Sequence, residues 1–284
     1  MALRTTVITG ATSGIGKQTA LALAKKQHEI YLLVRNTQKG DRLKDEIIAE
    51  TGNKNIFVVK CDLADLQSVR EAADELKAKL FAVNVLINNA GGIFSEKVTT
   101  KDGFETTFQV NHLGHFLLTM ALLPLLEKGQ TRVINVSSSA HQMGDGNFDD
   151  LTWEQKKYSA WKAYGNAKLD NLYFTKSLAE KYADKGITSF ALHPGIVKTD
   201  FWTGANGFLN KIIKLLSSPF MISAEEGAQT SIYLATEPGV DAKSCQYFVK
   251  SKVAKSSVLA WDEANRNKLW DISKKLVKKY LTEK

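Results

Sequence analysis

Cysteine and proline are scarce in this chain of 284 residues, which contains two cysteines and four prolines. A chain long enough to bury a large core needs no disulfide scaffold, so we expect a reducing, cytoplasmic location. The few prolines, with 19 glycines and 44% hydrophobic residues, exclude disordered and collagen-like chains. The composition is typical of a globular protein.

Long hydrophobic runs are also absent. The longest strongly apolar stretch, residues 115–126, is shorter than the roughly 18 to 20 residues that span a bilayer. The N-terminus passes into the first apolar run without the apolar segment of about 7 to 15 residues that a secretory signal contains. We therefore predict no transmembrane segment and no secretory signal, and leave peripheral contact with a membrane open.

Acidic residues are fewer than basic ones: 30 Asp and Glu against 38 Lys and Arg give a net charge of +8. This balance suits nucleic acid, an anionic membrane surface or an anionic cofactor. In residues 259–281 the lysines alternate with apolar residues at helical spacing, which is typical of a solvated helix face. Because no nucleic-acid recognition motif is present, we predict no nucleic-acid partner.

Seven short apolar runs rich in Val, Ile and aromatic residues predict strands, and the segments between them have helical periodicity. Most runs are continuous, so both faces of the sheet need cover. We predict an α/β fold: a single Rossmann-type doubly wound domain over residues 1–284, with a seven-stranded parallel sheet and helices on both faces. The predicted strands are residues 5–10, 29–34, 55–60, 83–91, 131–138, 187–195 and 245–250; the predicted helices are residues 15–26, 38–50, 67–80, 101–126, 163–183, 225–235 and about 258–281.

Irregular segments follow two of these strands at their carboxyl ends, where open α/β sheets bind ligands. Residues 141–161 are polar and rich in turn formers, whereas residues 208–216 carry an apolar stripe at helical spacing. We predict a substrate loop or lid over about residues 200–223, suited to a substrate with a hydrocarbon tail. The same stripe is compatible with contact with a membrane surface.

A glycine-rich turn joins the first strand to the first helix. Glycines let the backbone approach a pyrophosphate, which then binds the free N–H groups of the helix N-terminus. An ordinary loop is the alternative. The predicted cofactor-binding residues of this turn are Gly10, Thr12, Ser13, Gly14, Ile15 and Gly16.

The second strand ends in Arg35 and Asn36, where an acidic residue would bind the adenosine ribose 2′-hydroxyl of NAD. The guanidinium of Arg35 suits a 2′-phosphate, so the site favours NADP(H). Lys17 in the first helix would add positive charge nearby. The alternative is that Arg35 is an ordinary surface residue.

Three tyrosines precede a lysine by four residues, a spacing that puts both side chains on one helix face, where the ammonium lowers the pKa of the phenol. Tyr164 is distinguished by its small neighbours, which let a nicotinamide and a substrate approach. The three pairs are Tyr158 with Lys162, Tyr164 with Lys168, and Tyr280 with Lys284.

Together these motifs resemble those of the short-chain dehydrogenase/reductase family: TGxxxGxG in residues 9–16, NNAG in residues 88–91 and YxxxK from Tyr164. The resemblance implies that Tyr164 is the acid/base and that Lys168 holds the nicotinamide ribose. It further implies that Ser138 orients the substrate and that Asn111 kinks a helix and supports a water relay to the lysine. Alternation along the strand puts Ser137 and Ser139 on the face opposite Ser138.

The resemblance also implies further cofactor contacts. Asp62 is one of these implied contacts with the cofactor. The alternative is that Asp62 caps the N-terminus of the following helix, a role that Asp65 could also fill. His112 and His115 lack a carboxylate or cysteine partner in the sequence nearby, so we predict no metal site. The implied contacts are Asp62, Leu63, Asn89, Ala90, Gly91, Tyr164, Lys168, Pro194, Gly195, Val197 and Thr199.

Several segments, among them NHLGHFLLT, NVSSSAH and HPGIVKT, resemble the retinol dehydrogenase-like subgroup. This implies an NADP(H)-dependent oxidoreductase that interconverts an alcohol and an aldehyde or ketone, with a small apolar substrate. The alternative is a catalytically silent NADPH-binding sensor or scaffold. Members of the family often pair through helices that correspond to residues 101–126 and 163–183, so a homodimer stays open.

Overall fold

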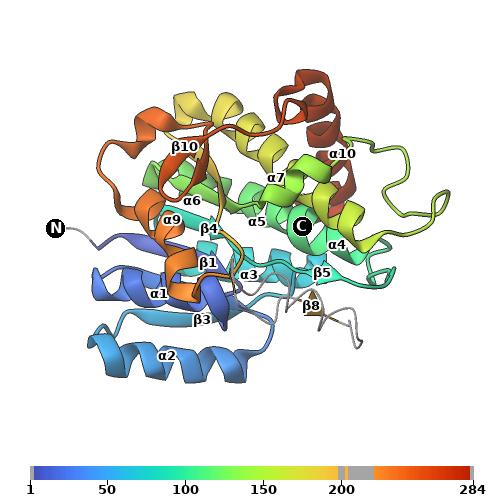
Figure 1. Cartoon of the computed structure of the whole chain (residues 1–284). Coiled ribbons are helices and arrows are strands. Elements are labelled where there is room, and N and C mark those ends of the chain that lie inside the picture. The colour runs from blue at the N-terminus through green and yellow to red at the C-terminus, as the bar shows by residue number, and fades with distance from the viewer. Residues whose placement is uncertain (1–2, 198–201, 204–220, 282–284) are drawn as a thin grey trace.

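The computed structural model describes residues 3–197, 202–203 and 221–281 and is built around an eight-stranded sheet (Figure 1). Its strand order is β10-β9-β7-β6-β4-β1-β2-β3, and seven neighbouring strands run parallel. The predicted parallel α/β fold is confirmed. The parallel strands are β1 (Thr5–Thr9), β2 (Glu29–Val34), β3 (Ile56–Lys60), β4 (Val85–Asn88), β6 (Arg132–Val136), β7 (Thr188–His193) and β9 (Tyr247–Val249).

The sheet has eight strands rather than the seven predicted, because β10 (Lys252–Ala254) pairs antiparallel with β9. Lys250 and Ser251 join them with φ angles of 50° and 60°, the left-handed conformation that a two-residue hairpin turn requires. Three residues, of which Lys252 and Val253 are exposed, form no apolar run. The pattern that identified the other strands is therefore missing here.

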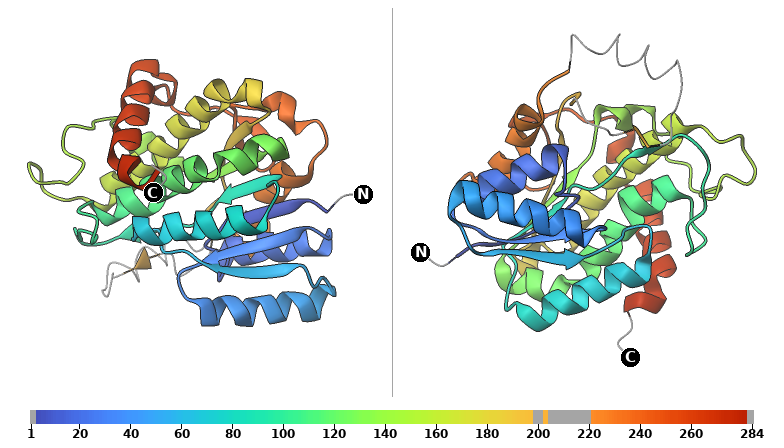
Figure 2. Two further views of the ribbon diagram at one scale, coloured as in Figure 1. Left: turned by 180° about the vertical axis from the view of Figure 1, so that it is seen from behind. Right: turned by 90° about the horizontal axis from the view of Figure 1, so that it is seen from below.

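Helices cover both faces of the sheet and enclose two apolar cores (Figures 1 and 2). On one face, α1 and α9 pack against each other, and Leu23, Ile47 and Leu234 from three helices bury against the strands. This face carries α1 (Gly14–Lys25), α2 (Thr37–Thr51) and α9 (Ala224–Thr236); the other carries α3 (Leu66–Lys79), α5 (Gly114–Ala121) and α7 (Ala160–Lys181).

The helix predicted over residues 101–126 is divided. It begins at α4 (Thr106–Phe108), whose N–H groups at Thr107 and Phe108 donate to the Glu105 carboxylate. A π-helical turn, η1 (Gln109–Leu113), follows, and α6 (Leu123–Gly129) comes after α5. A π-turn inserts one extra residue per turn and often marks a functional site, and here Asn111 lies at its centre.

The C-terminal helix α10 (Glu263–Leu281) starts later than the predicted residue 258, because a separate 3-10 turn, η6 (Leu259–Trp261), precedes it. Asp262 accepts a hydrogen bond from Asn265 N–H at 2.9 Å and so caps the helix. α10 packs on α5 and α7 (Figure 2). Trp270 contacts Phe116, with ring centroids 5.1 Å apart. α10 therefore covers part of the helices through which the resemblance implied a homodimer.

Most of the predicted lid, residues 200–223, lies outside the described residues, as does Thr199. Within it, the described residues of β8 (Trp202–Thr203) pair in parallel with β5 (Ile93–Phe94). Among the helices in the described part of the chain, none is both long and apolar enough to cross a membrane.

Candidate active site

The predicted motifs meet at one edge of the sheet because β1, β4, β6 and β7 are neighbours in it and run parallel. Gly10 follows β1, Asn89 follows β4, Ser138 follows β6 and Pro194 follows β7. Parallel strands end at the same edge, which is where doubly wound folds bind their ligands. Segments far apart in the chain thus form one candidate site.

The glycine turn after β1 depends on residues without a side chain. Gly10 and Gly14 have φ angles of 66° and 52°, which glycine adopts readily. A Cβ on Gly16 would overlap with the Gly10 carbonyl oxygen and lie 2.5 Å from Asn89 Nδ2. Asn89 Nδ2 donates to the carbonyl of Thr9 at 2.8 Å, so the second motif holds the first in place.

The N-terminus of α1 is uncapped in the described structure. Ser13 occupies the N-cap position with a φ of −158°, but its side chain accepts no hydrogen bond there, and the first turn has no acidic residue. The first N–H groups of α1 are therefore available to a phosphate. Other long helices have side-chain caps, from Asn36 on α2, Asp65 on α3, Ser159 on α7 and Ser223 on α9.

Thr9 and His115 connect the motifs, a role that the sequence did not predict for either residue. Thr9 Oγ1 accepts the N–H groups of Asn89 and Ala90 at 3.0 Å each and lies 2.9 Å from His115 Nε2. His115 Nδ1 lies 3.1 Å from the carbonyl oxygen of Asn111. The available signals were a threonine ending the strand and a histidine four residues after Asn111.

The two histidines of this helix are buried in hydrogen-bonded positions. Burial lowers the pKa of His115 to about 4 and that of His112 to about 3, so both are neutral near pH 7. His112 Nε2 lies 2.9 Å from Ser273 Oγ on α10. Over the described ranges, no three His, Cys, Asp or Glu side chains are grouped to hold a metal ion.

The four predicted catalytic residues lie together around Gly91. A Cβ on Gly91 would overlap with Asn111 Oδ1 and lie 3.2 Å from Lys168 Nζ. Lys168 Nζ lies 5.4 Å from the centre of the Tyr164 ring, and the Tyr164 hydroxyl is hydrogen-bonded to Ser138. The structure therefore brings these side chains from α7, η1 and the end of β6 into one cluster.

Lys168 and Asn111 are held firmly in this cluster. Lys168 is 2% exposed, its Nζ donates to the Val136 carbonyl at 3.0 Å, and burial lowers its pKa to about 7. Asn111 Nδ2 donates to the carbonyls of Thr107 and Gly92 at 2.9 and 3.0 Å. Its Oδ1 accepts the N–H of Gly92 at 3.2 Å.

The pKa of Tyr164 is raised above its ordinary value, whereas we predicted that Lys168 would lower it. Burial of the phenol raises the pKa, and the hydrogen bond with Ser138 lowers it by less. The phenol is therefore protonated near neutral pH.

The other two tyrosine–lysine pairs lie elsewhere. Tyr158 precedes α7, and its hydroxyl donates to the carbonyl of Phe94 at 3.0 Å. Tyr280, near the end of α10, donates to Asp102 at 2.8 Å, and its predicted partner Lys284 lies outside the described residues. Tyr164 and Lys168 are thus the pair at the carboxyl edge of the sheet.

The three serines after β6 have different surroundings, and because β6 ends at Val136 the predicted alternation does not put Ser137 and Ser139 in the same environment. Ser137 is buried and its Oγ donates to the carbonyl of Lys168 at 2.7 Å, while Ser139 is exposed. Ser138 is half-buried and accepts the N–H of Ala140 at 3.2 Å, in addition to its bond with Tyr164. Ser138 is therefore the serine that faces the cluster.

At the predicted adenosine end, Arg35 is exposed directly after β2. Lys17 forms an ion pair with Glu46 of α2 at 2.5 Å, so its charge is already engaged. Asp65 caps α3 by accepting the N–H groups of Gln67 and Ser68. The N-cap of this helix is therefore Asp65 and not Asp62. The Asp62 carboxylate accepts the N–H of Ala64, two residues further along the chain, at 3.0 Å.

Four further predicted contacts, from two segments of the chain, lie around the carboxyl edge of the sheet. Leu63 is buried and would lie 3.0 Å from a Cβ on Gly114, so it also packs against the start of α5. After Pro194, Gly195 has a φ of 98°, and Val197 forms an isolated bridge with Ile222. The loop after β7 therefore folds back toward the start of α9.

Comparisons with known proteins identify relatives of the chain. Residues 4–207 match the short chain dehydrogenase family. The chain is 42% identical over 272 residues to retinol dehydrogenase 12 from Mus musculus, covering 95% of this chain and 85% of that protein. It is 40% identical over 279 residues to retinol dehydrogenase 13 from Homo sapiens, covering 96% of this chain and 84% of that protein.

Solved structures share the fold. A protein from Mycobacterium Paratuberculosis superposes with a TM-score of 0.77 at 34% identity, covering 98% of this chain and 94% of that one. A blue fluorescent protein solved in complex with NADPH has a TM-score of 0.68 at 24% identity, covering 86% and 95%. The match in sequence over most of the chain means that this protein belongs to the short-chain dehydrogenase/reductase family of oxidoreductases and resembles its retinol dehydrogenases.

Proposed function

We propose that the protein is an NADP(H)-dependent oxidoreductase that interconverts an apolar alcohol and the corresponding aldehyde or ketone. The observation that carries this proposal is the cluster of Asn111, Ser138, Tyr164 and Lys168 around Gly91. A hydroxyl proton donor, a hydrogen-bonded serine and a buried lysine are the groups that carbonyl reduction needs beside a nicotinamide.

The glycine turn and the uncapped start of α1 fit the pyrophosphate of a dinucleotide, because both leave backbone N–H groups accessible. Gly91 lets Asn111 and Lys168 approach the backbone closely, and Lys168 would hold the nicotinamide ribose. Exposed Arg35 would pair with a 2′-phosphate through its planar guanidinium. When bound, the nicotinamide supplies or accepts the hydride.

In the reducing direction Tyr164 would donate its hydroxyl proton to the carbonyl oxygen of the substrate. Its raised pKa keeps the phenol protonated near neutral pH, which suits a proton donor. Ser138, already hydrogen-bonded to Tyr164, would orient the same carbonyl oxygen. Asn111 would support the water that returns a proton through Lys168.

Two lines support an apolar substrate. The relatives named retinol dehydrogenase 12 and 13 carry the name of an apolar alcohol. Residues 208–216 of the chain, in the predicted lid, form an apolar stripe. Mostly apolar walls with few polar groups are typical of pockets for such ligands.

The test is a turnover assay that follows the reduced nicotinamide, with all-trans-retinal, medium-chain aldehydes and ring ketones as substrates. NADPH and NADH are compared in parallel. We expect turnover of an apolar carbonyl with NADPH, and a loss of about 10²- to 10⁴-fold in kcat for Tyr164→Phe, because the variant lacks the transferable proton. Arg35→Ala should reduce the preference for NADPH about tenfold.

Tyr158→Phe is the matched control, since Tyr158 also precedes a lysine by four residues but lies off the cluster. Its kcat should stay within about twofold of the unmodified enzyme. NADPH binding without turnover of any carbonyl would instead support a silent sensor. Equal activity of Tyr164→Phe and the unmodified chain would remove Tyr164 from the mechanism.

A further inference from the structure

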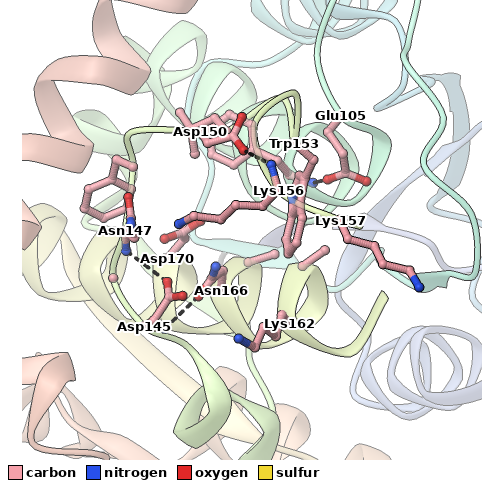
Figure 3. Close-up of a pocket in the computed structure, with 16 residues that line it drawn as sticks. Glu105, Asp145, Asn147, Asp150, Trp153, Lys156, Lys157, Lys162, Asn166 and Asp170 are labelled. Carbon is pink, nitrogen blue, oxygen red and sulfur yellow. Dashed lines mark hydrogen bonds between the residues drawn. The ribbon is translucent and has the colours of Figure 1, made fainter. Parts of the chain in front are cut away.

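A cavity of about 210 Å³ lies on another face of α7, beneath the loop of residues 144–157 (Figure 3). Its volume is several times what one water molecule needs. Neither the four predicted catalytic residues nor any predicted cofactor contact lines it. The lining residues are Glu105, Phe108, Asp145, Gly146, Asn147, Phe148, Asp150, Leu151, Trp153, Lys156, Lys157, Lys162, Ala163, Asn166, Ala167 and Asp170.

Much of the wall is apolar and aromatic. Phe108 comes from α4, whereas Phe148 and Trp153 come from the loop. Ala163 and Ala167, one turn apart on α7, leave room between the rings and the helix. Aromatic faces attract organic cations as well as apolar groups.

Asp170 of α7 is a buried carboxyl that faces this cavity (Figure 3). It is 2% exposed, and no hydrogen bond or ion pair joins it to any residue that the structure describes. A buried polar group without a partner is expensive, so such groups are normally hydrogen-bonded. Asp170 therefore points to a ligand that the cavity accepts.

The other carboxylates of the cavity are already engaged. Glu105 accepts two backbone N–H groups at the start of α4, at 2.7 and 2.8 Å. Asp150 accepts the N–H groups of three residues from 154 to 156 within its own loop. Asp145 accepts the N–H of Asn147 at 3.1 Å. Of the four carboxylates that line the cavity, only Asp170 accepts no hydrogen bond from a described residue.

We propose that this cavity binds a small organic ammonium ion, with the Asp170 carboxylate as its counter-ion and the three aromatic rings around its apolar part. A carboxylate at the base and aromatic walls form the chemical environment that recognises an alkyl- or arylammonium group. Lys156, Lys157 and Lys162 are exposed at the cavity, and none of them forms an ion pair with Asp170 in the described structure.

Binding should release a proton. Burial and the nearby Asp145 raise the pKa of Asp170 well above its ordinary value, which favours the protonated carboxyl when no cation lies beside it. An ammonium ion stabilises the ionised form, and the displaced proton passes to the buffer. Tyr173, one turn further along α7, is another titratable group close to Asp170, and burial raises its pKa to about 12.

Isothermal titration calorimetry of the full chain with benzylamine tests the site, and benzyl alcohol is the uncharged probe of the same shape. We expect saturable binding of benzylamine with release of protons, and no saturable binding of benzyl alcohol. Proton release is measured by repeating the titration in buffers of different ionisation enthalpy. Lys156→Gln should tighten binding, because it removes a competing positive charge.

Asp170→Asn should weaken the binding of benzylamine at least about tenfold. Asp149→Asn is its matched control, because Asp149 lies in the same loop but is exposed and does not line the cavity; it should bind as the unmodified chain does. Equal binding by Asp170→Asn, equal binding of benzyl alcohol, or no saturable binding of benzylamine would each overturn the proposal. The comparison with benzyl alcohol needs no variant, so equal binding of the two probes overturns the proposal even if Asp170→Asn fails to fold.

Discussion

Lys168 and Asp170 stand two positions apart on α7, and each is 2% exposed, yet they face different surroundings. Lys168 Nζ donates to the carbonyl of Val136 at the end of β6 and would lie 3.2 Å from a Cβ on Gly91. Asp170 faces the cavity under the 144–157 loop and has no hydrogen-bond partner among the described residues.

Burial is the largest cause that moves both groups toward their neutral forms. It lowers the pKa of Lys168 to about 7 and raises the pKa of Asp170. Neither shift stabilises the fold, because a buried ionisable group is costly in either case. The comparison therefore separates two reasons for keeping such a group: one belongs to the proposed catalytic cluster, and the other to a proposed ligand site.

The largest expected effect falls on the Lys168 side. Lys168→Met keeps the length and burial of the side chain but removes the amine, so we expect kcat to fall by about 10²-fold or more. The free energy of unfolding should not decrease, because an apolar chain replaces a buried amine. Steady-state kinetics and urea unfolding measure the two quantities.

Lys181→Met is the control, since Lys181 is an exposed lysine near the end of the same helix. Its activity should match that of the unmodified chain. A large loss of stability with Lys168→Met would mean that Lys168 serves the fold, and the contrast with Asp170 would then be lost.

Much of the fold could be predicted from the sequence because its signals are local. Continuous apolar runs located all seven parallel strands, and the glycine turn between β1 and α1 located the cofactor edge. Strand β10 was missed because a three-residue hairpin arm has no apolar run. The helix over residues 101–126 was predicted as continuous because a π-turn leaves the apolar spacing nearly unchanged.

The site was harder to predict where it depends on contacts between distant segments. The bond between Thr9 and His115 joins residues 106 positions apart, and no local pattern announces it. The rise in the pKa of Tyr164 follows from burial under other segments, so a rule based on the spacing to Lys168 gave the opposite direction. Nothing in the sequence around Asp170 distinguishes it from an ordinary helix residue, because its burial depends on the packing of the 144–157 loop against α7.

The next prediction concerns the pH dependence of stability, which should have opposite signs for the two groups. Because the pKa of Asp170 is raised on folding, the folded chain binds this proton more tightly than the unfolded chain does. The free energy of unfolding should therefore fall as the pH rises from about 4, the ordinary pKa of Asp, toward the pKa of Asp170 in the folded chain. The lowered pKa of Lys168 makes stability rise with pH between about 7 and 10.4. Each slope is at most about 1.4 kcal/mol per pH unit.

Urea unfolding at a series of pH values tests this prediction. Asp170→Asn should lack the fall seen in the unmodified chain above about pH 4, and Lys168→Met should lack the rise above about pH 7. Asp149→Asn, which alters an exposed carboxylate, should leave both slopes in place. Identical slopes in Asp170→Asn and the unmodified chain would show that Asp170 does not titrate with a raised pKa.

The smallest expected effect tests what holds the Lys168 side in position. Ser137 Oγ donates to the carbonyl of Lys168 at 2.7 Å and so ties α7 to the end of β6. Ser137→Ala should lower the free energy of unfolding by about 0.5 to 1.5 kcal/mol and reduce kcat, while benzylamine affinity at Asp170 stays the same. Ser139→Ala removes a neighbouring exposed hydroxyl and should change stability by less than about 0.5 kcal/mol. An equal loss of stability in the two variants would mean that the bond to Lys168 is not what ties the helix to the strand.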